Sequence, residues 1–276
     1  ACSDGAGAAS SGDTGGSAAD GASSSDADAR PQTNDGGAPD AAEDDGLPRY
    51  DYDGELGPER LFEHGVASGD PLVDAVVVWT RLSVEGNQDV EAFLEIAVDP
   101  TFSNRVAAGT YAARAADDHT VRVDATELQP GTTYYYRWSA LGRVSPIGRT
   151  RTLPIGRVDA LRFGVCSCSN YGFGYFYAYR QMARRADLDA VIHLGDYIYE
   201  YANPGFGSTY GTVRELDPPN EPITLDDYRR RYALYRRDPD LQELHRQNPM
   251  IHLWDDHEFT NDPFVGGAEN HDPAAH

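Results

Sequence analysis

The sequence predicts a multidomain protein: a β-sandwich over residues 58–154 and an α/β region over residues 155–276, behind an unfolded N-terminal segment. Residues 1–48 are mostly Ala, Gly, Ser and Asp, and they contain too few apolar side chains to offset chain entropy. Short apolar segments with strand periodicity follow, and after Pro154 strand-like and helix-like segments alternate. We therefore expect a disordered acidic tether and two folded regions.

The chain is strongly acidic, with a formal net charge of -22 and a pI near 4.5. Nucleic acids attract cationic surfaces, so we expect no nucleic-acid-binding surface. An acidic surface is compatible with divalent cations as partners. We expect a monomer.

Cys2 stands at the extreme N-terminus, ahead of the acidic tether. The start Ala-Cys-Ser-Asp is similar to a bacterial lipoprotein around its processing site, where the cysteine carries the lipid. This similarity implies an exported bacterial protein, periplasmic or at the cell surface, that meets the membrane through this lipid anchor only. The sequence has no apolar run of about 18 residues or more, so we expect no segment that spans a membrane.

The first folded region has strand signals throughout. Strands are expected at Ala75–Leu82, at Ala92–Asp99 and on both sides of the turn Pro130–Gly131. The phrase LQPGTTYYYRW resembles fibronectin type III domains, in which a tyrosine folds back onto the chain at a sheet corner. Tyr134 or Tyr136 would take that place, and we expect the aromatic run to pack in the core.

The second region alternates strands with helices, which is typical of βαβ units with a mainly parallel sheet. Strands are expected at Leu161–Cys168, Asp189–Asp196 and Pro249–Glu258. Helical spacing covers Gly174–Arg185, and Thr224–Gln247 is expected to form two short helices broken at Pro239. Thr224, followed three residues later by Asp227, predicts an N-cap.

Each of these three strands ends in potential metal ligands. They are Cys168 after the first strand, Asp196 and Tyr199 after the second, and Asp255, Asp256 and His257 after the third. Those after the second strand belong to the segment HLGDYIYEY at residues 193–201. By itself Asp196 is equally compatible with a helix N-cap. The carboxyl ends of parallel strands share one edge of a sheet, however, so three such clusters favour a metal site.

The ligand types narrow the choice of metal. A thiolate together with a phenolate favours a metal such as ferric iron, whereas carboxylates and carbonyls favour hard cations such as calcium or magnesium. Asp196 has two oxygens and is able to bridge two ions. A pair of ions clamps a phosphoryl group and generates hydroxide near neutral pH.

Four segments together resemble the alkaline phosphatase D, or PhoD-like, family: FGVCSCSNYGFGYFYAYR, HLGDYIYEY, TLDDYRRRYALYRRDPDLQELH and WDDHEFTND. The segment FEHGVASGDP (Phe62–Pro71) fits the start of that family's N-terminal domain. The resemblance implies a fibronectin type III-like β-sandwich followed by an α/β metallophosphoesterase domain. It also implies an exported enzyme that hydrolyses phosphate mono- or diesters with Fe³⁺ and Ca²⁺.

The resemblance assigns the iron side of the site as follows. Cys168 would ligate iron, with Cys166 as a neighbour and not a ligand. Asp196 would bridge iron and calcium, and it would act in catalysis. Tyr199 would supply the phenolate. For Tyr197 and Tyr201 we expect packing roles.

On the calcium and substrate side, Asp256 would replace the ligand asparagine of related phosphoesterases, and Asn261 would offer its amide oxygen to calcium. His257 would orient the substrate or assist the leaving group; a capping or salt-bridged histidine is the alternative. Most arginines of the helical segment are expected on a solvated face, and one or two contact phosphate, for which Arg236 and Arg237 are weak candidates.

The family's catalytic domain continues well beyond WDDHEFTND and takes further ligands from that part. His271 and His276 follow the third strand too closely to be those ligands. We therefore expect an incomplete catalytic domain with an unpaired sheet edge and unburied apolar faces, inactive or very weak as an isolated chain. The alternatives are a phospholipase D-type enzyme of the same family and a non-catalytic, truncated surface lipoprotein.

Overall fold

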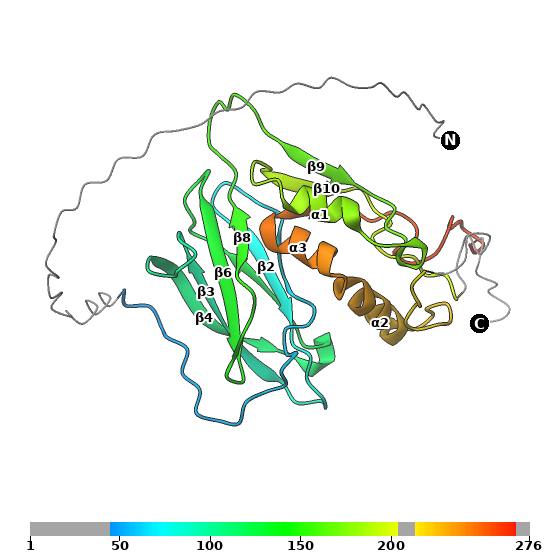
Figure 1. Cartoon of the computed structure of the whole chain (residues 1–276), viewed down its shortest axis with the longest axis horizontal. Helices are drawn as coiled ribbons and strands as arrows, with labels where there is room; N and C mark the ends of the chain where they lie inside the picture. The colour runs from blue at the N-terminus through cyan, green and yellow to red at the C-terminus, as the bar shows by residue number, and fades with distance from the viewer. Residues whose placement is uncertain (1–44, 204–212, 269–276) are drawn as a thin grey trace, which may run out of the picture. The chain divides into compact units, whose positions relative to one another are not determined.

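The computed structural model describes residues 45–203 and 213–268. Cys2, most of the predicted tether, His271 and His276 lie outside these residues. The described residues belong to one compact unit, and its strands form two sheets (Figure 1).

The first sheet is antiparallel, with the strand order β4-β3-β6-β7 and with β8 paired to β6. Its strands are β3 (Val90–Ala97), β4 (Arg105–Ala113), β6 (Thr133–Ala140), β7 (Arg143–Val144) and β8 (Gly148–Arg151). The second sheet has the order β5-β2-β1-β11-β10-β9. Its strands are β1 (Val66–Gly69), β2 (Val76–Arg81), β5 (Thr120–Ala125), β9 (Phe163–Cys166), β10 (Ala190–His193) and β11 (Met250–His252).

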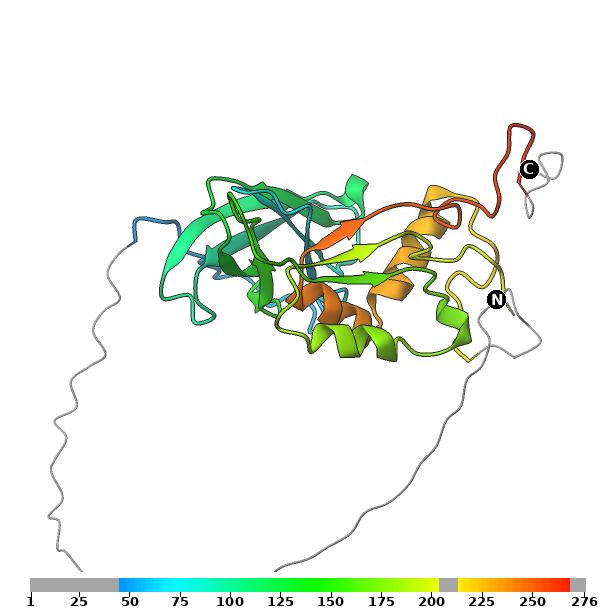
Figure 2. The same ribbon diagram turned by 90° about the horizontal axis from the view of Figure 1, so that it is seen from above.

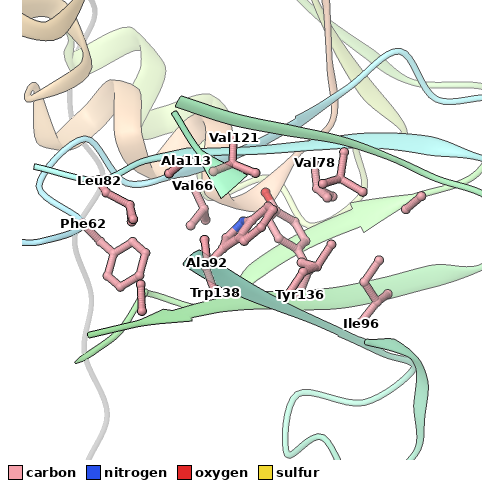
Figure 3. Close-up of a cluster of buried hydrophobic side chains, with 14 of the residues drawn as sticks. Phe62, Val66, Val78, Leu82, Ala92, Ile96, Ala113, Val121, Tyr136 and Trp138 are labelled. Atoms are coloured by element: carbon pink, nitrogen blue, oxygen red, sulfur yellow. The ribbon is translucent and has the colours of Figure 1, made fainter. Parts of the chain in front are cut away.

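An apolar core takes side chains from both sheets (Figure 3). Successive residues of β2 alternate between buried and half-buried positions, as expected for a strand with one face on a core. Tyr134, Tyr136 and Trp138 of β6 are at most 2% exposed. The prediction that the aromatic run packs in the core is therefore confirmed.

The turn before β6 has the bond expected at a sheet corner. Gly131 has a φ of +61°, a left-handed conformation that glycine adopts without strain. The Tyr134 hydroxyl accepts a hydrogen bond from the Gln129 amide at 2.7 Å. Of the two tyrosines considered for the corner, Tyr134 makes this contact. The fibronectin type III likeness itself stays a prediction.

The predicted alternation of strands and helices is present after Pro154. The helices are α1 (Tyr177–Ala183), α2 (Leu225–Arg236) and α3 (Pro239–Gln247), with short 3₁₀ turns at Ala115–Asp117 and Tyr171–Phe173. Strands β9, β10 and β11 pair in parallel. Helices α1 and α3 lie on one face of these strands (Figures 1 and 2) and contribute to a second apolar core with Leu241 and Leu244 of α3.

The helix boundaries follow the predicted signals. Thr224 and Asp227 form a capping box at the start of α2. Pro239 occupies the first turn of α3, and the Asp238 side chain accepts the amides of Asp240 and Leu241. The longest described helix, α2, has 12 residues, and no described helix is long and apolar enough to cross a membrane.

The third predicted strand is shorter than expected, because β11 ends at His252 and the chain turns at Asp256. The amides of Phe259 and Thr260 both bond to the Asp256 carbonyl, at 3.0 and 2.8 Å. The residues expected at the end of this strand therefore lie on a turn.

One sheet continues across the predicted boundary near Pro154. Strand β1 pairs in parallel with β11, with Gly69 opposite Met250. A Cβ at Gly69 would lie 2.7 Å from the Met250 carbonyl oxygen, so the close approach depends on glycine. The ion pair of Arg151 with Asp189, at 2.6 Å, also crosses the boundary. The two predicted regions are joined by backbone pairing.

The sheet face opposite α1 and α3 carries exposed apolar side chains. Phe163 and Val165 of β9 are 41% and 58% exposed, whereas Gly164 between them is buried and faces Met182 of α1. Within the described residues β9 is an edge strand. These observations agree with the predicted unpaired edge and unburied apolar face.

Several histidines are buried as neutral rings. Burial, together with Arg81, lowers the pKa of His64 to about 3. Burial and His252 lower that of His193 to about 3. The Gly195 amide donates to His193 Nδ1 at 3.3 Å, so the proton of the neutral ring lies on Nε2, which faces Ser169 and Tyr179.

Leu244→Ala should lower the free energy of unfolding by about 2–5 kcal/mol, because it leaves a cavity in the core beneath α3. Leu244 is 0% exposed, whereas Leu225 in α2 is 67% exposed. Leu225→Ala is the matched control and should cost less than about 1 kcal/mol. Urea unfolding followed by circular dichroism measures both, and equal losses would contradict the assigned core.

Stability should fall as the pH drops below 6.5. His64 and His193 have folded pKa values of about 3, below the ordinary value of 6.5, so the unfolded chain takes up protons first. Their contribution is fully present above pH 6.5 and is lost towards pH 3, at about 1.4 kcal/mol per pH unit for each histidine. His64→Gln removes one of these histidines, so the slope of the unfolding free energy against pH should fall by about 1.4 kcal/mol per pH unit. An unchanged slope between pH 6.5 and 5 would contradict this.

Candidate metal centre

The parallel strands β9, β10 and β11 bring the predicted ligands to one edge of the sheet. Val191 of β10 lies opposite Gly164 of β9 and Met250 of β11, so the three strands end side by side. The loops that follow them carry Cys168, Asp196 and Asp256. This is the arrangement expected for ligands beyond the carboxyl ends of parallel strands.

Asp196, Asp256 and His257 form a compact cluster, whose potential ligand atoms all lie within 4.8 Å of one another. Asp196 and His257 are each 8% exposed. No helix begins at Asp196, since residues 197–203 contain none, so the capping alternative is wrong.

One oxygen of Asp196 fits a cation. Its Oδ1 is buried and has no hydrogen-bond partner among the described residues. Burial, with a further contribution from Asp256, raises the pKa of Asp196 above its ordinary range. A buried carboxylate oxygen is costly unless a donor or a cation satisfies it. The residues present therefore fit a metal ion at this point.

Tyr199 lies against the cluster. Its hydroxyl donates to Asp196 Oδ2 at 3.0 Å, and its ring lies 4.1 Å from the His257 ring, centroid to centroid. Burial, followed by the charge of Asp196, raises the pKa of Tyr199. The side chain is thus a phenol here, and it would become a phenolate ligand only if a cation displaced its proton.

The Cys168 loop is bonded to the Asp196 loop. The Cys168 amide donates to the Gly195 carbonyl at 3.2 Å, and the Ser169 amide donates to the Asp196 carbonyl at 2.8 Å. The exposed Cys168 thiol is close enough to influence the pKa of Asp196 and of Tyr199. Cys168 and Asp196 both have left-handed φ angles, +59° and +52°, which cost energy for these residue types and cluster at functional sites.

Cys166 differs from Cys168 in its surroundings. Burial raises the pKa of the Cys166 thiol to about 11, so it stays protonated near neutral pH. Only the thiolate is an effective ligand. This agrees with the prediction that Cys166 is a neighbour of the site and not a ligand.

His257 is oriented by Glu200, a residue that the sequence did not single out. The Glu200 side chain is fully buried; its Oε2 accepts from His257 Nδ1 at 2.8 Å, and its Oε1 accepts from the Asn261 amide at 2.7 Å. Burial lowers the pKa of His257, but the hydrogen bond and charge of Glu200 outweigh it and raise the pKa. With Nδ1 committed to Glu200, Nε2 remains for chemistry in the cluster.

The structure distinguishes the two neighbouring aspartates. Asp255 is exposed and lies outside the cluster. Asp256 belongs to it, and its Oδ2 accepts the Asp262 amide at 2.6 Å. The backbone of Asn261 lies in the same loop, bonded to Glu200, whereas a role for its amide oxygen stays a prediction.

The arginines are not all on a solvated face. Arg231 is fully buried and donates to the carbonyls of Tyr199, Tyr201 and Pro218. Arg236 is 8% exposed and lies over the Trp79 ring at 4.5 Å. The expectation of a solvated face is therefore wrong for these two, because loop carbonyls and an aromatic ring surround them.

The weak substrate-binding candidates have partners outside the cluster. Arg236 donates to the His64 carbonyl at 3.2 Å, and Arg237 lies 3.8 Å from an oxygen of Asp217. A phosphate contact by either arginine stays a prediction.

A cleft of about 1190 Å³ lies between α2 and strands β2 and β5. Trp79, Tyr228 and Trp254 are among the residues that line it, and none of the three cluster residues does. We place the chemistry at the cluster, where ligand atoms and a buried unpaired oxygen coincide.

Two family models match the chain. The model described as PhoD-like phosphatase covers residues 163–276, and the model described as PhoD-like phosphatase, N-terminal domain, covers residues 54–154. Alkaline phosphatase D of Bacillus subtilis (strain 168) is 44% identical over 209 residues, which are 72% of this chain and 36% of that protein.

Among solved structures, "Structure of PhoD" matches with a TM-score of 0.70 and 41% identity, over 74% of this chain and 40% of that chain. The fn3 domain of human collagen alpha-1(XX) chain matches with a TM-score of only 0.25 and 19% identity, over 41% of this chain and 95% of that chain. The chain thus spans less than half the length of the two PhoD proteins that it matches.

Proposed function

The chain belongs to the PhoD-like phosphatase family, and on this premise we propose that the whole protein is a metal-dependent hydrolase of phosphate mono- or diesters. The observation that carries the proposal is the buried cluster of Asp196, Asp256 and His257, with its unpaired Asp196 oxygen. Neither the phospholipase D-type alternative nor the non-catalytic alternative is favoured by these findings.

We propose Fe³⁺ and Ca²⁺ for the site, the pair that the family resemblance implies and with which the donors agree. Cys168 and Tyr199 would supply the soft and phenolic donors that suit ferric iron, and Asp256 would supply a hard oxygen that suits calcium. Asp196, whose Oδ2 accepts the Tyr199 hydroxyl and whose Oδ1 has no described partner, would contribute its carboxylate to the same site. When bound, such ions supply positive charge beside a phosphoryl group and lower the pKa of water.

The protein's own groups would act on the substrate as follows. Glu200 holds His257 by Nδ1, which leaves Nε2 to interact with a substrate. A proton at Nε2 stabilises the oxygen that leaves when the phosphate ester is cleaved. The raised pKa of His257 favours the protonated ring that this step requires.

We further propose that the protein is exported and anchored through a lipid on Cys2. The support is the segment Ala-Cys-Ser-Asp, which resembles a lipoprotein processing site and precedes an acidic segment poor in apolar residues. Such a segment would act as a solvated tether between the membrane and the folded residues.

Substitution of the assigned ligands should abolish metal binding in the protein of natural length. Cys168→Ala, Asp196→Asn and Asp256→Ala should each remove metal, measured by mass spectrometry of the elements. Each should also lower the hydrolysis of p-nitrophenyl phosphate by about 100-fold or more, since even outer partners of a metal site are worth 10–100-fold.

Two neighbours give matched controls for these variants. Cys166→Ala and Asp255→Ala repeat the changes made in Cys168→Ala and Asp256→Ala at positions two and one residues away, outside the assigned ligands, and should keep the metal and most of the rate. Wild-type metal content and rate in Asp196→Asn would refute the assignment.

The lipid anchor is tested separately. The wild-type protein, expressed with its natural leader, should fractionate with membranes and carry the mass of a lipid on its first cysteine. Cys2→Ser should be recovered in the soluble fraction, whereas Ser3→Ala should stay with membranes. An unmodified Cys2 in the wild-type protein would overturn this proposal.

A further inference from the structure

The loops after β10 and β11 touch at a point where only a glycine fits. Gly195 has a φ of +105°, and a Cβ there would lie 2.5 Å from Asp255 Cβ and 2.6 Å from the Asp255 amide nitrogen. Asp196 and Asp256 each follow directly after one of these two residues. The separation of the two cluster aspartates therefore depends on how this contact is held.

Glu258 holds the contact. Its carboxylate is buried, with the residue 4% exposed, and it reaches both loops. Oε1 accepts the Tyr197 amide at 2.5 Å. Oε2 accepts the Asp196 amide at 3.2 Å and the Asp255 amide at 2.8 Å. One side chain thus binds three backbone amides, two on the β10 loop and one on the β11 loop.

These contacts distinguish Glu258 from a metal ligand. Both of its oxygens are occupied by amide donors, and it is not a member of the compact cluster of ligand atoms. Hydrogen bonds from backbone amides to a carboxylate are short and strong, because the acceptor is charged. They fix the two loops relative to each other more firmly than apolar contact would.

We propose that Glu258 is a positioning residue that sets the separation of Asp196 and Asp256 for cation binding. The inference rests on the proposed function, since it requires that these aspartates hold a cation. Calcium takes oxygen ligands at about 2.3–2.6 Å, so a shift of about 1 Å in one loop removes a ligand. Outer partners of this kind are typically worth 10–100-fold in metal affinity.

Two substitutions distinguish the effect of the reach of the Glu258 side chain from the effect of its charge. Glu258→Gln keeps the length of the side chain, but it offers a single acceptor oxygen and presents its NH₂ group to a backbone amide. Glu258→Asp keeps the charge, but it is one methylene too short to reach both loops. Ca²⁺ is titrated by calorimetry into the protein of natural length, and iron content is measured alongside.

The matched control is Glu95→Gln. Glu95 on β3 is also buried, at 6% exposed, and it pairs with Arg105 and Arg137, far along the chain from both loops. Glu95→Gln replaces a buried carboxylate with an amide, as Glu258→Gln does. It therefore shows what a general loss of stability does to calcium affinity.

We expect both Glu258 variants to weaken Ca²⁺ binding by about 10–100-fold, with calcium affinity unchanged in Glu95→Gln. If Glu258→Asp binds Ca²⁺ like the wild type, charge and not position is responsible, and the proposal is overturned. It is equally overturned if Glu95→Gln weakens binding as much as Glu258→Gln. If Glu258→Gln does not fold, Glu258→Asp decides the outcome.

Asp196→Asn in the same titration separates this inference from the proposed function. Calcium binding lost in Asp196→Asn but kept in both Glu258 variants would refute only the positioning role. Calcium binding kept in Asp196→Asn would refute the metal site itself, and the role of Glu258 with it.

Discussion

The structure depends on how four carboxylates are satisfied at one end of the sheet. Asp196, Glu200 and Glu258 are buried and Asp256 is half-buried in the loops after β10 and β11, and a buried charge is costly unless donors or cations surround it. Glu200 and Glu258 accept backbone amides and, for Glu200, an imidazole N–H. Asp256 accepts the Asp262 amide. Asp196 alone among these four keeps a buried oxygen without a described partner. Backbone amides and one imidazole thus satisfy the other three carboxylates, and one oxygen of Asp196 is left without a donor among the described residues.

This arrangement requires the parallel sheet, and the sheet in turn connects the two predicted regions. Strand β11 pairs with β10 on one side and with β1 on the other. The loop that carries Asp256 is therefore held by a strand that is hydrogen-bonded to the sandwich. Residues near the N-terminal end of the folded chain, such as Gly69, contribute to the position of the site through Met250. Family models match both parts, 54–154 and 163–276, and the sheet gives a physical reason for their occurrence together.

The arginines show the limit of a sequence pattern. Five arginines between residues 229 and 237 have the appearance of a solvated helix face. In the folded chain Arg231 is buried and binds the carbonyls of Tyr199 and Tyr201, which belong to the loop that also carries Asp196. A guanidinium has five donors in a fixed plane, so one side chain satisfies several loop carbonyls at once. Its role here is to hold the loop.

The sequence by itself predicted the three helices, most of the longer strands, the capping box at Thr224, the break at Pro239 and the polar residues that follow the parallel strands, because each depends on neighbours within a few residues. It also determined the family, through motifs spread along the chain. Tertiary structure decided that Asp256 and not Asp255 enters the cluster, that Glu200 and Glu258 satisfy the surrounding loops, and that β1 joins β11. These choices depend on contacts between residues up to about 180 positions apart, and distances of that kind are fixed only when the chain has folded.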